Sequence, residues 1–496
     1  MNYFEYVKML REGKVVAQDG IDFAKHDKRY HHGNFVPSFM SCSLRHSLSK
    51  MEEEDTHRHM AGGGGGVTDA ASEAKRQYDE VVAHYTNPDG TMNPGWMKAP
   101  NGKDTKLTQD QWVHVRTQNF KRWFGDWETL AKIAAIMELK PIFLPTDEFV
   151  PNSKLQLKNL FSSFGDVKND LDGRDIIFPR GIVGKIRVQS GVKDVGRFAP
   201  AFKEAFEKSI PAFVEEPDVI EGHKDHYNYS KYRHYVGKIK NVDGEFYVRF
   251  TITEEVSGKR DEFHASTISE ISIYENKGAA SSGPGPKPGG NTAPFVDDKL
   301  SNFLTSVNPQ NVSKIIDENG EPMVVFHGSN HTHTEFDNRK SDFRNNTPDG
   351  HSFFSDKRSV AASYTPMGEG ADVIFEKSDW PYVDVKFKDG RTERQYYDSG
   401  GVYSVFLSLK NPLVVDAHGD EWSAVRFDGK RMATNEISAI AAKRGHDSVV
   451  FTNVIDGAAR HKPEPSTTLV AFAPEQVKSA THNNGVFSET DPNINH

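Results

Sequence analysis

Short apolar runs bounded by turn-forming residues recur through the last third of the chain and predict a mostly β region. They are rich in β-branched and aromatic residues, as strands are. The runs are "MVVFHG", "HSFFS", "VYSVFLSLKNPLVVD", "HDSVVFTNV" and "TTLVAFA". Two stretches between them, "KRSVAASYT" and "TNEISAIAAKRG", predict helices. The closing stretch "QVKSATHNNGVFSETDPNIN" predicts a polar tail.

The pattern differs between residues 140 and 276, where a helix and several strands alternate. "YRHYVGKIKNVDGEFYVRFTITEE" predicts two strands joined around Asp243 and Gly244, which is a hairpin turn pair. "DLDGRDIIFP" and "DEFHASTISEISIYE" predict further strands. Four apolar residues follow helical spacing: Phe202, Ala205, Phe206 and Ile210. This part is therefore expected to be a small, compact α+β domain.

Residues 67–139 combine a helical stretch, "SEAKRQYDEVVAHY", with a cluster of aromatic residues. Thr108 precedes Gln109 and is a plausible helix N-cap. The aromatic residues are Trp112, Phe120, Trp123, Phe124 and Trp127. With Lys121 and Arg122 they could stack on nucleic acid, but a small aromatic core is the commoner explanation and is favoured here.

Two segments that cannot pack a core divide the chain. Gly62 to Gly66 are consecutive glycines, and Asn276 to Pro294 is rich in Gly, Pro and Ser, as flexible linkers are. We therefore expect an α+β multidomain protein. Its parts are a polar N-terminal segment (1–66), a helical Trp-rich connector (67–139), a central domain (140–276), a linker (277–294) and a C-terminal domain (295–496).

Composition narrows the class of protein. The 496 residues carry a formal net charge of -9, so no chain-wide basic surface indicates nucleic-acid binding. Cys42 is the single cysteine, which excludes an intrachain disulfide and favours a reducing compartment. The N-terminus lacks the apolar core of a signal peptide, and no run is long enough for a membrane helix. A cytoplasmic protein without a membrane partner is expected.

The N-terminal segment is rich in histidine, which raises the question of a metal site. The residues are His26, His31, His32, His46, His57 and His59. They lack cysteine partners and the spacing of metal ligands, so a polar and partly disordered surface is favoured and no metal is assigned.

The strand "VVFHGS" places a histidine directly before a glycine. A strand holds His327 rigid, and Gly328 permits close approach of a ligand to the backbone. Tyr364 ends the following predicted helix. Together these residues could form a slot for a planar ring. The plainer alternative, a core histidine and a core tyrosine, is favoured on spacing alone.

Several motifs in one order make this region resemble a known family. "FHGS", "FFSD…VAASY", "LSLKNPLVVD", "GHDSVVFTNV", "FAPEQVKSAT" and "NNGVFSETDPNI" are similar to ADP-ribosyltransferase-like domains of phage and prophage polyvalent proteins. These belong with the diphtheria-toxin and poly(ADP-ribose) polymerase branch, which has a His–Tyr–acid signature. The resemblance spans about Asn311 to Asn495. It implies a split β-sandwich and NAD-dependent mono-ADP-ribosyl transfer, a glycosyl transfer, to a macromolecule of the host.

The resemblance also implies roles for individual residues. His327 would bind the adenine-side ribose of NAD, the backbone of Gly328 the nicotinamide carboxamide, and Tyr364 would stack on the nicotinamide ring. The residues expected to bind NAD are His327, Gly328, Ser329, Phe353, Ala361 and Tyr364. Ala361 stands where the polymerase branch often has a serine.

The sequence departs from this pattern at the acid. Alignment of "TTLVAFAPEQV" places Thr468 where the family has its carboxylate, and Glu464 lies four residues upstream. Cleaving an N-glycosidic bond needs a carboxylate to steady positive charge. Loss of one such contact typically costs about 3 kcal/mol, a factor of roughly 10² to 10³ in rate. Tyr364, Thr468 and Glu464 are the catalytic candidates. A slow transferase, a different acid and binding without turnover all remain open, and transfer is favoured.

The central domain resembles, more loosely, nuclease-like domains of polyvalent proteins related to BrnT, barnase and RelE ribonucleases. RNA cleavage needs a base, an acid and cations at the phosphate. The candidates are His223, His226, His234, Arg233, Arg249 and His264. A solvated loop explains "GHKDHYNYSKYRHY" more simply. RNA contact and a toxin-like ribonuclease are thus the first alternative, and a non-catalytic phage structural or delivery protein is the second.

Overall fold

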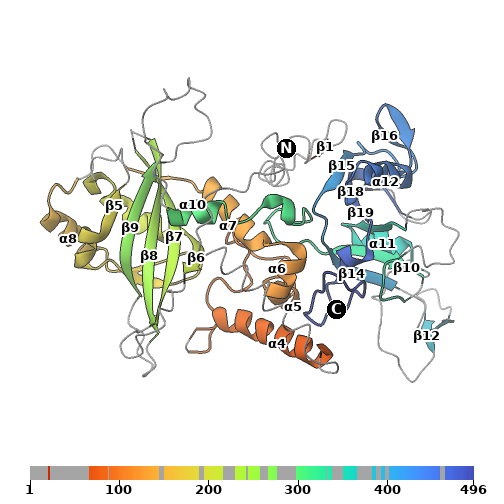
Figure 1. The fold of residues 1–496 in the computed structure, drawn as a ribbon, viewed down its shortest axis with the longest axis horizontal. Coiled ribbons are helices and arrows are strands. Elements are labelled where there is room, and N and C mark those ends of the chain that lie inside the picture. The colour runs from red at the N-terminus through yellow and green to blue at the C-terminus, as the bar shows by residue number, and fades with distance from the viewer. Residues whose placement is uncertain are drawn as a thin grey trace. The chain divides into compact units, whose positions relative to one another are not determined.

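A computed structural model describes most of the chain from residue 66 onward, together with residues 21–22. Its described ranges are 21–22, 66–87, 89–144, 150–188, 195–215, 229–241, 244–256, 266–275, 298–330, 332–337, 350–365, 382–386, 392–396, 401–457 and 464–496. Two compact units form (Figure 1). The C-terminal unit comprises 1–84, 106–127 and 309–496, and the central unit comprises 85–105 and 128–308.

The C-terminal unit is built on one sheet with the order β1-β15-β18-β19-β11-β10-β14-β20. The strands are β1 (Ile21–Asp22), β15 (Pro412–Asp416), β18 (Ser448–Ile455), β19 (Pro465–Ala471), β11 (Ser352–Ser355), β10 (Val325–Ser329), β14 (Gly401–Leu407) and β20 (Val477–Ser479). Two separate hairpins are β12 (Tyr382–Lys386) with β13 (Thr392–Tyr396), and β16 (Val425–Phe427) with β17 (Lys430–Met432). Each predicted apolar run contains a strand, and the run "VYSVFLSLKNPLVVD" contains two, β14 and β15.

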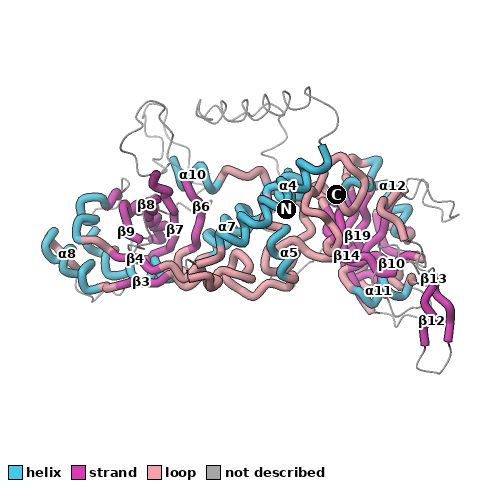
Figure 2. Tube along the Cα trace, turned by 90° about the horizontal axis from the view of Figure 1, so that it is seen from below, coloured by secondary structure: helices cyan, strands magenta, loops and turns pink. Residues whose placement is uncertain are grey.

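One weak joint divides this sheet. Strand β10 pairs with β14 over its whole length, and β11 pairs with β19 over its whole length. Between β10 and β11 the ladder consists of the single pair Phe326 and Ser355. Figure 2 shows β19, β10 and β14 in one layer, with α11 (Arg358–Ser363) near β10 and α12 (Thr434–Lys443) near β19. The two halves of the sheet therefore separate beside β10.

Both predicted helices of this region pack apolar side chains on the sheet. Ile437 and Ala441 of α12 lie in a buried cluster with Phe451 of β18. Ala361 and Ala362 of α11 pack with Phe326 and Val402, across β10 and β14. Each helix thus covers a different half of the sheet.

Aromatic side chains of α5 (Gln109–His114) and α6 (Gln118–Phe124) belong to the core of the C-terminal unit. Thr108 caps α5 by a capping box with Gln111, as its position predicts. The ring of Phe120 packs edge-on against Phe406 and Phe487, with centroids 5.2 and 5.0 Å away. The aromatic cluster is therefore a buried core, and not a surface for stacking. The longer α4 (Gly66–His84) precedes these helices.

The end of the chain is not the polar tail that its composition predicts. Val477–Ser479 form β20, the edge strand of the sheet, which pairs with β14. Phe487 and Ile494 are buried in the core. The ammonium of Lys478, fully buried, donates to the carbonyls of Asp491 and Asn493. Because these few apolar side chains and backbone bonds tie the segment down, it folds despite its polar composition.

The central unit also has a sheet, with the order β2-β7-β8-β9-β4-β3 and with β6 and β5 pairing β7 and β9. Figure 1 shows the long strands β7, β8 and β9 side by side. The strands are β2 (Ile142–Phe143), β3 (Asp166–Lys168), β4 (Asp175–Ile177), β5 (Ile186–Val188), β6 (Ile210–Glu215), β7 (Tyr229–Asn241), β8 (Gly244–Val256) and β9 (Ser266–Glu275). The helices are α7 (Trp127–Glu138), α8 (Lys154–Ser163), α9 (Phe202–Glu207) and α10 (Asp298–Leu304).

The predicted hairpin is confirmed by the pair Asn241 and Gly244, although Asp243 itself lies outside the described residues. The helical spacing predicted through Ile210 is wrong at its end. Helix α9 stops at Glu207, and Ile210 starts β6 opposite Val236 of β7. A buried position in a sheet edge satisfies the same spacing, so periodicity alone could not separate the two.

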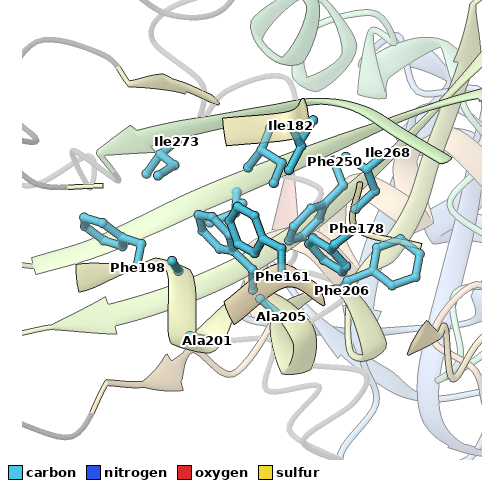
Figure 3. Close-up of a cluster of buried hydrophobic side chains, with 14 of the residues drawn as sticks. Phe161, Phe178, Ile182, Phe198, Ala201, Ala205, Phe206, Phe250, Ile268 and Ile273 are labelled. Atoms are coloured by element: carbon cyan, nitrogen blue, oxygen red, sulfur yellow. The ribbon is translucent and has the colours of Figure 1, made fainter. Parts of the chain in front are cut away.

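Phenylalanines of the helices and strands fill the core of the central unit (Figure 3). The rings of Phe206 in α9 and Phe250 in β8 meet edge to face at 5.5 Å. Phe161 of α8 stacks on Phe202 at 6.2 Å. Burial of each such side chain contributes about 1.5–3 kcal/mol, so this one face of the sheet accounts for much of the unit's stability.

Several sequence expectations concern residues outside the described ranges. They are the histidines at 26, 31, 32, 46, 57 and 59, the linker from 277 to 294, and His223, His226 and His264. In the described part of the chain, no helix is long and apolar enough to cross a membrane. The same residues include no group of three or more potential metal ligands.

Candidate functional site

His327 stands at the joint where β10 and β11 separate. Its Nδ1–H donates to the carbonyl of Phe353, at 2.6 Å, in place of a further ladder bond. The ring is surrounded by Phe336, Phe354 and Tyr403, with centroids 5.0 to 6.2 Å away. Burial lowers the pKa of His327 to about 4. The imidazole is therefore neutral near pH 7, and its Nε2 is an acceptor.

Gly328 faces the opposite side of β10, because side chains alternate along a strand. A Cβ atom there would lie 1.8 Å from the carbonyl oxygen of Ala361 and 3.2 Å from the Cβ of Tyr364. A side chain would clash with the backbone of α11. Helix α11 therefore occupies the space that a side chain at position 328 would need.

Tyr364 directly follows α11 and lies beside Gly328. The phenol donates to Oδ1 of Asp456 at 2.6 Å, and 41% of the residue is exposed. Burial of the phenol and the neighbouring carboxylate both raise the pKa of Tyr364. The hydroxyl group therefore stays protonated and acts as a donor throughout the neutral pH range.

Asp456 connects the tyrosine to the aligned acid position. Thr468 of β19 is buried, and its Oγ1 donates to Oδ2 of Asp456 at 3.0 Å. The backbone N–H of Gly457 donates to Oδ1 at 2.7 Å. Three donors from three parts of the chain thus fix both oxygens of this carboxylate.

Sequence reasoning missed Asp456. The register pairs Thr468 with Phe451, so a regular ladder would carry Asp456 five residues away from Thr468. The ladder is irregular between Phe451 and Val454, and Asn453 takes a left-handed φ of 53°. The available clue was an Asp-Gly pair directly after the strand "SVVFTNVI", and apolar periodicity does not report such a bend.

Glu464, the acid suggested as a substitute, lies elsewhere. Its carboxylate accepts from Lys357 Nζ at 3.0 Å and from Ser359 Oγ at 3.2 Å. Four residues of extended strand separate it from Thr468, about 13 Å. The structure therefore does not bring Glu464 to Thr468, and its charge is already paired.

The remaining expected residues divide between the two sides of the joint. Ser329 ends β10 opposite Gly401 of β14. Phe353 is partly buried against the cluster beneath α12. Ala361 is buried in α11. Asp456 thus joins Tyr364 to Thr468, and Gly328 and Ala361 lie against each other beside Tyr364, while His327 faces the other side of β10.

Other acids of the region have structural partners. Asp356 accepts from the N–H of Thr467, Asp416 from His418 and Asn453, Asp447 from Lys410 and Asn411, and Glu436 from the N–H of Ala433 at the start of α12. Each holds backbone or a turn in place.

A second polar cluster lies on the central sheet. His234 accepts at Nδ1 from Arg249, 2.9 Å away, and donates from Nε2 to Glu215, at 3.2 Å. Arg249 also donates to Glu270 and Tyr274. Burial and the adjacent guanidinium lower the pKa of His234 to about 4. Both nitrogens of this buried imidazole are therefore occupied.

The ribonuclease candidates are not assembled in the described part of the chain. Arg233 precedes His234 on β7 and so points to the opposite face of the sheet. His234 and Arg249 bond each other and their neighbours, as in an internal network.

Comparison with known proteins bears on one of the two units. Residues 317–487 match a family model described as ADP-ribosyltransferase in polyvalent proteins. This range contains β10, α11, Asp456 and β19. No curated protein and no solved structure was found to match the chain. The C-terminal unit therefore contains a region similar to ADP-ribosyltransferase domains, and the central unit has no such assignment.

Proposed function

We propose that the C-terminal unit is a NAD-dependent mono-ADP-ribosyltransferase that acts on a macromolecule, within a polyvalent protein encoded by a phage or prophage. The family match supports the class of reaction. The observation that carries the proposal is the placement of Tyr364. This partly exposed residue lies beside Gly328, with its Cβ 3.2 Å from the position of a Cβ at 328, and the resemblance assigns the backbone of Gly328 to the nicotinamide carboxamide.

The geometry accounts for how these residues would hold NAD. Tyr364 offers a ring face for stacking on nicotinamide, and Gly328 offers backbone groups at the joint where β11 leaves β10. His327 is neutral with Nδ1–H already committed to Phe353, so its Nε2 accepts a hydrogen bond from a ribose hydroxyl group. Ser329, Phe353 and Ala361 line or support the same joint.

The proposed reaction exchanges one bond for another without oxidation or reduction. The bond between the nicotinamide nitrogen and the ribose C1′ breaks, and its electron pair neutralises the pyridinium ring. The ribose carries positive charge until a nucleophile of the acceptor adds to C1′ and loses a proton. The products are nicotinamide, the ADP-ribosylated acceptor and one proton, and water in place of the acceptor gives free ADP-ribose.

The test measures nicotinamide release and NAD binding by the full-length protein, with and without a cell lysate as the source of acceptor. Stacking on an aromatic ring is worth about 1–3 kcal/mol, so Tyr364→Ala should weaken NAD binding or turnover roughly ten- to a hundredfold. Phe143→Ala removes an exposed ring from the central unit, where 69% of Phe143 is exposed, and should change neither. A wild-type protein that neither binds NAD nor releases nicotinamide would overturn the proposal.

A further inference from the structure

We infer that Asp456, directly after β18, supplies the carboxylate that Thr468 lacks in the middle of β19. This inference rests on the proposed function and adds the identity of its acid. Tyr364 and Thr468 hold Asp456 between them at 2.6 and 3.0 Å. The negative charge would then come from the residue after β18 and not from the neighbouring strand β19.

The position of the carboxylate fits this exchange. A glutamate at position 468 would place its carboxylate oxygens about 2.4 Å from its γ carbon, across one carbon–carbon bond of about 1.5 Å and one carbon–oxygen bond of about 1.2 Å. Oδ2 of Asp456 lies 3.0 Å from the γ oxygen of Thr468. The nearer carboxylate oxygen of Asp456 therefore lies within about 1 Å of the distance that the oxygens of a glutamate at 468 would reach from the γ position.

The charge of Asp456 is available, whereas that of Glu464 is not. All three donors to Asp456 are neutral: a phenol, an alcohol and a backbone N–H. Among the residues that the structure describes, no Lys, Arg or His forms an ion pair with it. Glu464 is paired with the ammonium of Lys357. A carboxylate that is fixed but not neutralised is the group that can steady positive charge on the ribose.

Tyr364 links this charge to the proposed nicotinamide position. The same residue that offers its ring for stacking donates its hydroxyl proton to Asp456. The raised pKa of the phenol keeps that proton in place, so the carboxylate is oriented before substrate arrives. During bond cleavage Asp456 would face the ribose as its C1′–N bond breaks and the pair of electrons leaves with nicotinamide.

The decisive variant is Asp456→Asn in the full-length protein, which keeps the size of the side chain and removes its charge. Nicotinamide release should fall about 10²- to 10³-fold, the usual effect of losing one preorganised electrostatic contact. The affinity for NAD, measured by calorimetry, should change less than about threefold. Asp428→Asn is the matched control, because Asp428 is an exposed acid of the same unit paired with Arg444, and turnover should be unchanged.

A second variant moves the charge to the aligned position. Thr468→Glu added to Asp456→Asn should restore turnover at least tenfold above the single variant. Turnover equal to that of the single variant would argue for a structural role and against the inference. A parallel fall of turnover, NAD affinity and melting temperature in Asp456→Asn would do the same.

The inference and the proposed function can fail separately. Wild-type turnover that Asp456→Asn leaves intact would overturn the inference and leave the transferase standing. A wild-type protein without NAD binding or turnover would overturn both. If Glu464→Gln, and not Asp456→Asn, abolished turnover, the acid would be Glu464 despite its ion pair.

Discussion

The polar side chains around Asp456 in the C-terminal unit and those around Arg249 in the central unit are similar groups in different electrostatic settings. Each unit holds a histidine whose pKa is lowered to about 4, and each group of polar side chains includes a carboxylate and a hydroxyl group. On the central sheet, Arg249 is 4% exposed and its guanidinium meets Glu270, while Glu215 meets Lys299. In the C-terminal unit, Asp456 has neutral donors, and Tyr364 beside it is 41% exposed.

This difference separates a network that stabilises the fold from a site that can act on a substrate. Buried charges that pair with one another neutralise each other and leave little field for a ligand. A charge held by neutral donors at the surface retains most of its field, which a developing cation can use. The presence of His, Arg and Glu together is therefore weaker evidence for catalysis than the way in which their charges are balanced.

The largest effect is expected from removing the positive charge of Arg249 at the centre of the buried network. Arg249→Met keeps an unbranched side chain and removes the guanidinium that donates to Glu270 and His234. Breaking a buried pair from one side costs about 3–5 kcal/mol. We expect the free energy of unfolding of the central unit to fall by that amount, measured by denaturant titration with amide exchange read at β7 and β8.

The matched control removes a second partner of Glu270. Arg187→Ala deletes a guanidinium that is 77% exposed and pairs with Glu270 at 3.0 Å. Exposed pairs are worth about 0–1 kcal/mol, so the loss should be small. Nicotinamide release should survive in both variants. A loss of turnover in Arg249→Met with the central unit still folded would contradict the assignment of a purely structural role to this network.

The two histidines make a second, intermediate test through pH. In the unfolded chain a histidine protonates near pH 6.5, whereas in the folded units His234 and His327 protonate near a pKa of about 4. The pKa is depressed by folding, so each contributes stability that is complete above pH 6.5 and lost as pH falls toward 4. At pH 5 the loss is on the order of 1–2 kcal/mol for each histidine.

This loss should be visible separately in each unit. His234→Gln should flatten the decline between pH 7 and pH 5 in amide exchange at β7 and β8 alone. His327→Gln should flatten it at β10 and β14 alone. If the loss of stability between pH 7 and pH 5 is unchanged in either variant, groups other than that histidine cause it.

The sequence predicts the strands and helices of the C-terminal unit better than it predicts the site. Apolar runs locate β10 and β19, and helical spacing locates α11, since burial on one face determines each of them. The contact of Gly328 with α11 depends on how a helix crosses a strand, which periodicity does not encode. Asp456 reaches Thr468 only through an irregular ladder. The motif indicates β19 as the strand on which the acid is expected. Only the fold shows that the carboxylate of Asp456, directly after the neighbouring strand β18, reaches Thr468.

Glu464→Gln should give the smallest effect, and it tests whether an ion-paired carboxylate takes part in the reaction. The carboxylate and its partner Lys357 are 42% and 35% exposed, so losing their attraction should cost about 0–1 kcal/mol. Ser359 still has an amide oxygen to which it can donate. Nicotinamide release should stay within about twofold of wild type, in contrast to Asp456→Asn. A larger fall in release at unchanged stability would mean that the paired acid takes part in the reaction, and that charge balance does not by itself separate the two kinds of carboxylate.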